Sequence, residues 1–293
     1  MNRMERWNLA AAAADSIIDS FSTSVKRAVA LFESSQTALE KLILPEIESA
    51  LGAEIGTYSR GKSEYKGETR FLSYLLDIDG LLWEETIRQV SAIAKRGKGG
   101  MFHPGDFIIL PVNVPEVKID GFAFPVVKIT DTRLIVTAAY ADKVAFNFEN
   151  VIFHAPMNKE YTNEGGFKAS LLARYLNEYF LPSVFKEVES YLMPNCDGLK
   201  VSIPTYVEVF GNVNDNYNAT NWGEKARHPY FEKCTNRIKV KESDRDDTHW
   251  WWLSSPDAAS ATNFCYVNNG GYAGSYGGAS EVSGGVAPAI CIS

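Results

Sequence analysis

The chain has 293 residues, of which 45% are hydrophobic and 22% are charged, and its formal net charge is −7. This composition is typical of a globular protein and excludes a disordered or collagen-like chain. Because Asp and Glu outnumber Lys and Arg by 36 to 29, we expect no nucleic-acid partner. No apolar run approaches the roughly 20 residues that span a bilayer, so we expect no membrane insertion.

A heptad pattern occupies residues 11–42. Apolar or small residues recur there at alternating spacings of three and four: Ala11, Ala14, Ile18, Phe21, Val25, Ala28, Phe32, Ser35, Leu39 and Leu42. This spacing predicts a coiled-coil seam, which Pro45 should end or kink. Two interpretations stay open. The helix either packs on its own domain, or it drives homo-oligomerisation or attachment to a larger assembly.

A second amphipathic helix is predicted for residues 69–95. Its apolar face is formed by Phe71, Leu75, Ile78, Leu82, Ile87, Val90 and Ile93. Gly97, Gly99 and Gly100 then break the helix, and the hydrophobic period changes after them. We therefore predict a helical assembly or attachment region over residues 1–96 and a second domain over residues 101–293.

The second domain has the pattern of an α+β fold. Short apolar runs at residues 106–112, 122–129 and 133–139 predict strands, and helices are predicted at about 167–180 and 184–192. Trp250, Trp251 and Trp252 alternate faces on a strand that Pro256 ends, so one or two of them must be buried. The apolar run 286–292 predicts a core strand beside it.

Patterns that would indicate catalysis or metal binding are incomplete. Residues 56–63 match the spacing GxxxxGKS, but the strand and the helix that a phosphate loop needs are not predicted around them. The asparagine-rich loop at residues 212–216 offers oxygen ligands for calcium without a bidentate Glu, so a solvated loop is favoured. The four histidines are scattered and are interpreted as surface or satisfied core residues: His103, His154, His228 and His249. We predict no catalytic residue, no metal and no cofactor.

The four cysteines are Cys196, Cys234, Cys265 and Cys291. They are widely separated and form no CxxC pair, so a zinc site or a redox motif is not indicated. We interpret them as small buried thiols of a protein made in a reducing cytoplasm.

The segment between the tryptophan strand and the last strand has the composition of a binding surface. It is made almost wholly of small residues, Asn and Tyr, in which Tyr supplies rigid contact area and Ser, Gly and Asn supply adaptable hydrogen bonds. The candidate ligand-binding residues are Asn263, Tyr266, Asn268, Asn269, Tyr272, Ser275, Tyr276 and Ser280. The alternative is an ordinary Gly-rich surface loop.

These residues also carry a resemblance. The matching positions are Trp251, Trp252, Leu253, Ser255, Pro256, Ala261, Val267, Gly271 and residues 285–289. Together with the segments 87–106 and 172–181, they resemble the C-terminal domains of phage and prophage virion proteins. Those domains look like C-type-lectin-type folds similar to formylglycine-generating enzymes. The resemblance covers about residues 85–293, and Ala287 departs from it because that position is often Arg.

The resemblance implies a C-type-lectin-like domain that follows the N-terminal helices. Some members are variable proteins of diversity-generating retroelements, in which Asn codons of this segment are diversified. Between Asp257 and Val286 only Glu281 lies outside the amino acids that NNC codons encode, which fits such diversification. The calcium-binding triplets of sugar-binding lectins are missing, and Cys265 and Cys291 lack the surroundings of the redox-active cysteine pair.

The leading hypothesis is a non-enzymatic phage structural protein located in the virion. Its C-terminal domain would bind a protein or glycan on the host surface, and its N-terminal helices would join other virion proteins. Two alternatives stay open: an enzyme of the formylglycine-generating type that uses Cys265 or Cys291, and a structural virion protein without a binding role.

Overall fold

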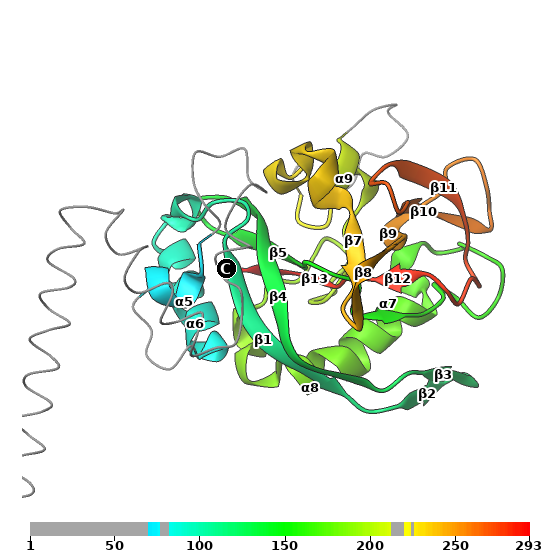
Figure 1. Ribbon diagram of the computed structural model, residues 1–293, viewed down its shortest axis with the longest axis horizontal. Helices are drawn as coiled ribbons and strands as arrows, with labels where there is room; N and C mark the ends of the chain where they lie inside the picture. The colour runs from blue at the N-terminus through cyan, green and yellow to red at the C-terminus, as the bar shows by residue number, and fades with distance from the viewer. Residues whose placement is uncertain (1–69, 77–81, 212–219, 224–225) are drawn as a thin grey trace, which may run out of the picture. The chain divides into compact units, whose positions relative to one another are not determined.

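The computed structural model describes residues 70–76, 82–211, 220–223 and 226–293 (Figure 1). Packing divides the chain into Met1–Arg60 and Gly61–Ser293, and every described residue belongs to the second unit. The predicted heptad at residues 11–42, the GxxxxGKS match and the asparagine-rich loop lie outside the described residues.

The described part is a mixed α+β fold in which strands predominate, as the sequence predicts. Its first sheet has the order β1-β4-β5-β13 and is antiparallel throughout. The strands are β1 (Phe107–Val114), β4 (Val127–Ala139), β5 (Val144–Phe148) and β13 (Ala289–Ile292). The hairpin of β2 (Val117–Ile119) and β3 (Phe122–Phe124) lies between β1 and β4 in the chain.

The strand predicted at 106–112 is confirmed, but the gap predicted between the runs 122–129 and 133–139 is wrong, because β4 runs unbroken from Val127 to Ala139. The predicted run 122–129 is split, because β3 ends at Phe124 and β4 begins at Val127. Pro125 stands between them and cannot donate a hydrogen bond to a sheet. Pro111 is tolerated inside β1 because the register with β4 shifts between Leu110 and Val112.

The second sheet has the order β11-β10-β9-β12-β6. Its strands are β6 (Phe153–His154), β9 (Trp251–Pro256), β10 (Asn263–Val267), β11 (Ala273–Gly278) and β12 (Gly285–Val286). Trp251 and Trp252 are both buried and β9 ends at Pro256, as predicted. The side chains of these two tryptophans belong to different parts of the core, because they point to opposite faces of the strand.

The prediction of one strand over residues 286–292 is wrong. Only β12 lies beside the tryptophan strand, where Gly285 pairs in parallel with Trp251. The chain then passes through Pro288 into β13, which pairs with β5 of the first sheet. The carbonyl oxygens of Ala287 and Pro288 accept hydrogen bonds from the buried side chain of Asn147, which holds this crossing between the two sheets.

The segment 69–95 also differs from its prediction. It contains α5 (Leu72–Leu75) and α6 (Trp83–Lys95), separated by residues outside the described ranges, and Leu82 is extended and 56% exposed. Helix α6 buries Ile87, Val90 and Ala94 and contacts β1 and β13. This helix therefore shares the core of the strands that follow it. The predicted division into regions 1–96 and 101–293 is otherwise not tested, because most of the first region is not described.

The remaining helical elements are short. Residues 167–184 form η3 (Phe167–Ala169), α7 (Leu171–Tyr175), the π-helix η4 (Leu176–Phe180) and α8 (Leu181–Val184). The helix predicted at 184–192 is the 3-10 helix η5 (Lys186–Tyr191). Further along lie η2 (Gly99–Met101), α9 (Tyr206–Phe210), η6 (Pro229–Glu232) and η7 (Cys234–Arg237), and the hairpin of β7 (Lys239–Lys241) and β8 (Asp244–His249).

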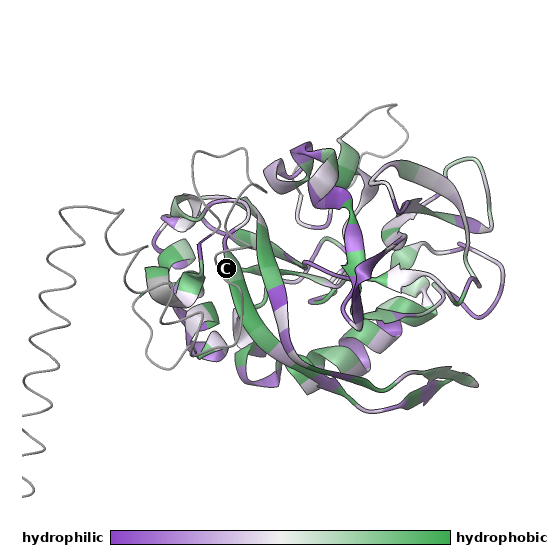
Figure 2. Ribbon diagram, viewed as in Figure 1, coloured by the Kyte–Doolittle hydropathy of each residue, from purple (hydrophilic) through white to green (hydrophobic). Residues whose placement is uncertain are grey.

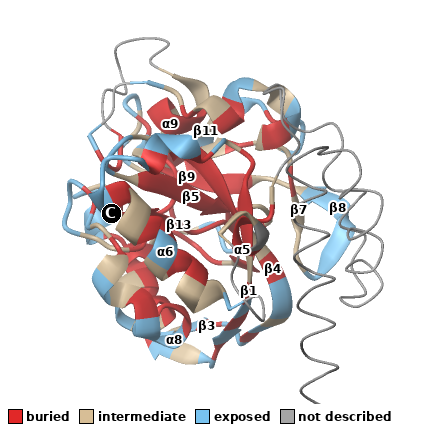
Figure 3. Ribbon diagram, turned by 90° about the vertical axis from the view of Figure 1, so that its left-hand side faces the viewer, coloured by how far each residue is buried: buried red, intermediate tan, exposed pale blue. Residues whose placement is uncertain are grey.

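Hydropathy and burial both distinguish the central strands from the β7–β8 hairpin. Figure 2 shows β1, β4 and β5 as mainly hydrophobic strands and the β7–β8 hairpin as mainly hydrophilic. In Figure 3, β5, β9 and β13 are buried at the centre, while β8 is exposed at the side. Among the described residues, no helix combines the length and the apolar character that crossing a membrane requires.

Candidate functional site

The eight predicted ligand-binding residues lie on one hairpin. Asn263 and Tyr266 belong to β10, Asn268, Asn269 and Tyr272 belong to the connecting turn, Ser275 and Tyr276 belong to β11, and Ser280 follows β11. We call these eight residues the β10–β11 surface. The hairpin forms one end of the second sheet, because β11 is the outermost strand (Figure 1).

The hairpin is anchored by β10 and exposes side chains of the turn and of β11. Phe264, Cys265 and Val267 are buried in the core, so they fix the strand in the sheet. By contrast, Tyr272 is 65% exposed and Tyr276 is 82% exposed. Such large aromatic side chains in water are available to contact a ligand. Asn269 is exposed as well, and the other five members are half-buried.

The turn between the two strands uses Asn268 as a structural residue. Its Oδ1 accepts hydrogen bonds from the backbone N–H groups of Gly270 and Tyr272, at 2.9 and 3.0 Å. Its own backbone N–H donates to the carbonyl oxygen of Tyr272. Gly271 has φ +81°, a conformation that L side chains rarely adopt. The turn therefore holds Tyr272 in place through backbone bonds and leaves its ring exposed.

Tyr266 packs more extensively than the composition of its segment indicates. Its ring lies against Gly274 so closely that a Cβ atom at that glycine would overlap the ring. The ring also meets the edge of Trp250, with centroids 5.3 Å apart, and Trp250 in turn meets Trp252. Tyr266 is thus a partly buried support of the surface, and only part of its ring faces solvent.

Tyr161 is a member of this region that the sequence analysis missed. Its side chain is 57% exposed, its hydroxyl group donates to Oδ1 of Asn263 at 3.2 Å, and its ring lies directly over Gly278. The backbone around it is tied to the hairpin, because Asn163 donates to the carbonyl oxygens of Ser260 and Asn263. No local signal marks Tyr161, since its partners are about a hundred residues away in the chain.

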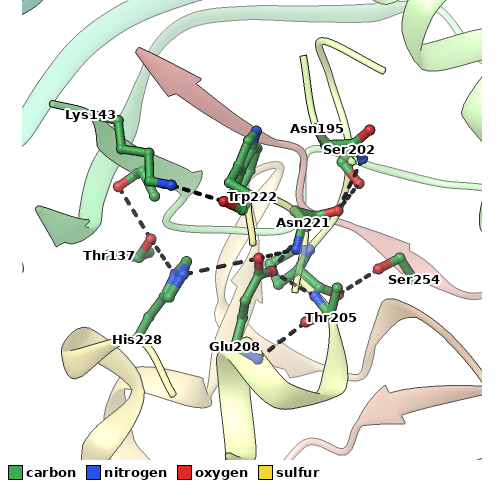
Figure 4. Close-up of polar contacts among 12 residues, drawn as sticks. Thr137, Lys143, Asn195, Ser202, Thr205, Glu208, Asn221, Trp222, His228 and Ser254 are labelled. Carbon is green, nitrogen blue, oxygen red and sulfur yellow. Dashed lines mark hydrogen bonds and ion pairs between the residues drawn. The ribbon is translucent and has the colours of Figure 1, made fainter. Parts of the chain in front are cut away.

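A buried polar network surrounds Glu208 of α9 (Figure 4). Glu208 accepts hydrogen bonds from the backbone N–H groups of Thr205 and Asn221 and from the side chain of Asn221, at 2.7 to 2.9 Å. Thr205 and Glu208 also form a capping box at the start of α9. Because these oxygens are engaged by the chain itself, we interpret the network as a structural anchor that joins the start of α9 to Asn221.

His228 lies beside this network and is buried. Its Nδ1 is 3.0 Å from the hydroxyl oxygen of Thr137, and its Nε2 is 4.0 Å from Oε1 of Glu208 without a hydrogen bond. Burial, with a smaller contribution from the positive charge of Lys143, lowers the pKa of His228 to about 3. The side chain is therefore neutral at neutral pH.

Two further histidines, His154 and His249, are in aromatic contact. His154 and His249 meet edge to face with centroids 4.4 Å apart, and His154 lacks a hydrogen bond at Nε2. The interpretation of all histidines as surface or satisfied core residues is therefore wrong for His154 and His228. Within the described ranges, no three His, Cys, Asp or Glu side chains are grouped so that they could hold a metal ion.

The four cysteines form no disulfide with one another, and only Cys265 and Cys291 are fully buried. The prediction of four buried thiols is wrong for Cys196, which is exposed, and for Cys234, which is half-buried. The Sγ atom of Cys234 lies 3.3 Å from the carbonyl oxygen of Gly270, at the turn of the β10–β11 hairpin.

The described part is an α+β domain with two main sheets, and the β10–β11 hairpin at the edge of the second sheet exposes two tyrosines. A family model described as Domain of unknown function (DUF6273) matches residues 134–293, which is more than half of the chain. The chain therefore belongs to the DUF6273 family. The match includes the C-terminal part of β4, the whole second sheet and the β10–β11 surface. Neither the curated proteins nor the solved structures gave a match.

Proposed function

We propose that this protein is a non-enzymatic ligand-binding protein of a phage or prophage virion and that the β10–β11 surface contacts the ligand. The observation that carries the proposal is the exposure of Tyr272 and Tyr276 on a hairpin whose strand β10 is fixed in the core. Exposed tyrosines on a rigid support are what a protein surface needs to bind a partner at low entropic cost.

The proposed C-type-lectin-like fold rests on the sequence resemblance. Support comes from the role of its motif residues, since Trp251, Trp252 and Leu253 are core residues of β9. Residues 285–289 link β12 to β13 and are buried throughout. A motif built of core residues is expected when it marks a fold. In this proposal the N-terminal region attaches the domain to other virion proteins, and retroelement diversification alters the residues between β9 and β12.

The alternatives have less support. An enzyme of the formylglycine-generating type would use Cys265 or Cys291, but the side chains of both residues are fully buried. A purely structural virion protein leaves the exposure of Tyr272 and Tyr276 without a role. No observation favours either alternative over ligand binding.

The test is to replace the tyrosines in the full chain. Ligands are first selected from two probes, an array of immobilised oligosaccharides and a library of random peptides. Tyr272→Ala and Tyr276→Ala should each weaken binding by about thirtyfold or more, since an aromatic anchor contributes about 2 kcal/mol. Val126→Ala is the matched control, because Val126 is 61% exposed and lies between β3 and β4.

The outcome is decided by binding and folding together. The proposal holds if both tyrosine variants lose binding and keep their melting temperature, while Val126→Ala keeps both its binding and its melting temperature. Unchanged binding in both tyrosine variants would show that the β10–β11 surface is not the ligand site.

A further inference from the structure

The outer edge of β11 has no strand beside it in the described part of the chain. The sheet order places β10 on one side of β11 and leaves the other side open. An open edge presents backbone N–H and C=O groups that can pair with another chain. The edge follows the sequence Ala273-Gly274-Ser275-Tyr276-Gly277-Gly278, in which Tyr276 carries the one large side chain.

The register shows which backbone groups point to that edge. The backbone N–H of Asn268 donates to the carbonyl oxygen of Tyr272, so these two residues form a hydrogen-bonded pair. The next pair, Val267 and Ala273, is then of the non-hydrogen-bonded type, in which the backbone groups point away from the partner strand. By this alternation the N–H and C=O groups of Ala273 and the N–H group of Ser275 point outward, before the register shifts at Ser275 and Tyr276.

Features that usually protect a strand edge are sparse on β11. Two other outer strands carry them, because β1 contains Pro111 and β8 contains four consecutive charged residues from Asp244 to Asp247. β11 contains neither a charge nor a proline, although its register with β10 shifts once, between Phe264 and Tyr266. Small side chains at Ala273, Gly274 and Ser275 leave the backbone accessible.

Carboxylates outnumber cations in the segments beside the edge. From Asp257 to Val286 the chain carries two carboxylates, Asp257 and Glu281, and no Lys, Arg or His. Glu160 and Glu164 are exposed on the segment that places Tyr161 over Gly278, and Lys159 and Lys168 are its exposed cations. A segment with basic side chains complements this surface, whereas an acidic one is repelled.

We infer that the ligand is an extended polypeptide segment with basic side chains, which adds to the sheet as a strand along the open edge of β11. Backbone hydrogen bonds to Ala273 and Ser275 supply the pairing, and Tyr272 and Tyr276 pack on side chains of the added strand. This inference rests on the proposed function, because it specifies which class of ligand the β10–β11 surface binds.

The experiment uses the full chain and the peptides selected from the random library. Each selected peptide is resynthesised with N-methyl groups at single backbone positions. N-methylation at alternate positions should weaken binding about tenfold or more, while the intervening positions tolerate it, because only every second N–H of a strand faces β11. This arm leaves the protein unaltered. Selected peptides should also be enriched in Lys and Arg.

A protein variant gives the second arm. Ser275→Pro removes an outward N–H and should weaken peptide binding about tenfold or more, while Ser275→Ala keeps the N–H and binds like the native chain. Melting temperature and circular dichroism report whether Ser275→Pro is folded. If it is not folded, the N-methylated peptides decide the result.

The outcomes separate this inference from the proposed function. If Tyr272→Ala and Tyr276→Ala abolish binding but N-methylation has no alternating effect, the surface binds its ligand without strand addition and the inference is overturned. Selection of oligosaccharides alone also overturns it, as does a dimer that Ser275→Pro converts to monomers, since the occupant is then a second copy. If the tyrosine variants bind normally, the proposed function itself has failed.

Discussion

Trp252 shows at the scale of one residue why the segment after β9 is rich in glycine. The side chain is fully buried, and its Nε1–H donates to the carbonyl oxygen of Ala155 at 2.9 Å. Gly277 and Gly284 lie against the indole ring, and a Cβ atom at either position would overlap it. These two glycines are therefore packing residues, although they belong to the segment proposed to be diversified.

The first prediction concerns these glycines. Gly277→Ala should destabilise the domain by about 1–3 kcal/mol, because the added methyl group forces the indole ring or the strand to move. Gly100→Ala is the control, since a Cβ atom there meets nothing within 4 Å. Chemical denaturation of both variants measures the difference. Equal stabilities for the two would contradict the contact between Gly277 and Trp252.

His228 gives a prediction on pH at the same scale. Its pKa is about 3 in the folded protein, mainly because of burial, against an ordinary value of 6.5. Between these values the unfolded chain binds a proton that the folded chain does not, so stability is complete above about pH 6.5 and falls as the pH falls. Lys143 opposes protonation, while Oε1 of Glu208, 4.0 Å from Nε2, favours it.

We expect His228→Leu to reduce the loss of unfolding free energy between pH 6.5 and pH 4.5. One buried histidine accounts for at most about 1.4 kcal/mol per pH unit. Some dependence of the unfolding free energy on pH should remain in His228→Leu, because burial and the charge of His249 also lower the pKa of His154, to about 4. The exposed His103 supplies the control variant His103→Leu. A slope in His228→Leu that matches the native slope would refute the assignment.

At the scale of elements, β9 connects the two parts of the core. Trp251 packs with Phe231, their ring centroids being 6.2 Å apart, and its Nε1–H donates to the carbonyl oxygen of Arg237. Trp252 faces the other side and belongs to the cluster that includes Phe264. The strand thus holds β10 in place, and the exposed tyrosines depend on it indirectly.

The prediction at the scale of elements compares these tryptophans with the exposed Tyr272. Trp251→Ala and Trp252→Ala should each cost about 3–5 kcal/mol of unfolding free energy, because a large cavity replaces a buried ring. Tyr272→Ala should change it by about 0.5 kcal/mol or less. Thermal and urea unfolding of the three variants give the comparison, and a large loss from the tyrosine variant would make Tyr272 a packing residue.

At the scale of the whole molecule, the ends of the described part are tied into the same domain. Asp106 is buried and accepts hydrogen bonds from Arg70 through Nε at 3.0 Å and through Nη2 at 2.6 Å. At the other end, the carbonyl oxygen of Ser293 accepts a hydrogen bond from the hydroxyl group of Ser91 on α6. The unit Gly61–Ser293 therefore has its own closed core.

The prediction at this scale concerns self-association. If the heptad at residues 11–42 drives oligomerisation, the full chain should sediment as a larger species than a chain that begins at Gly61. Both samples need to be compared at several concentrations, with circular dichroism to confirm folding of the shorter chain. Two monomers would mean that the heptad does not drive self-association.

The sequence by itself determined those features that depend on local patterns. The strands near residues 107–112, 133–139 and 251–256 follow from apolar runs bounded by Pro, Gly and Asp, and the exposure of Tyr272 and Tyr276 follows from a segment with few apolar residues to bury. Both signals act over a few residues, because the period of a strand and the composition of a loop are local properties.

Only the tertiary structure decided where distant segments meet. It divided residues 285–292 between two sheets, placed Tyr161 over Gly278, and set Gly277 and Gly284 against Trp252. It also made β11 an outer strand, which no pattern within Ala273–Gly278 indicates. These contacts join residues as far apart in the chain as Val144 and Ile292, and they are selected by the fit of side chains in a common core rather than by local preference.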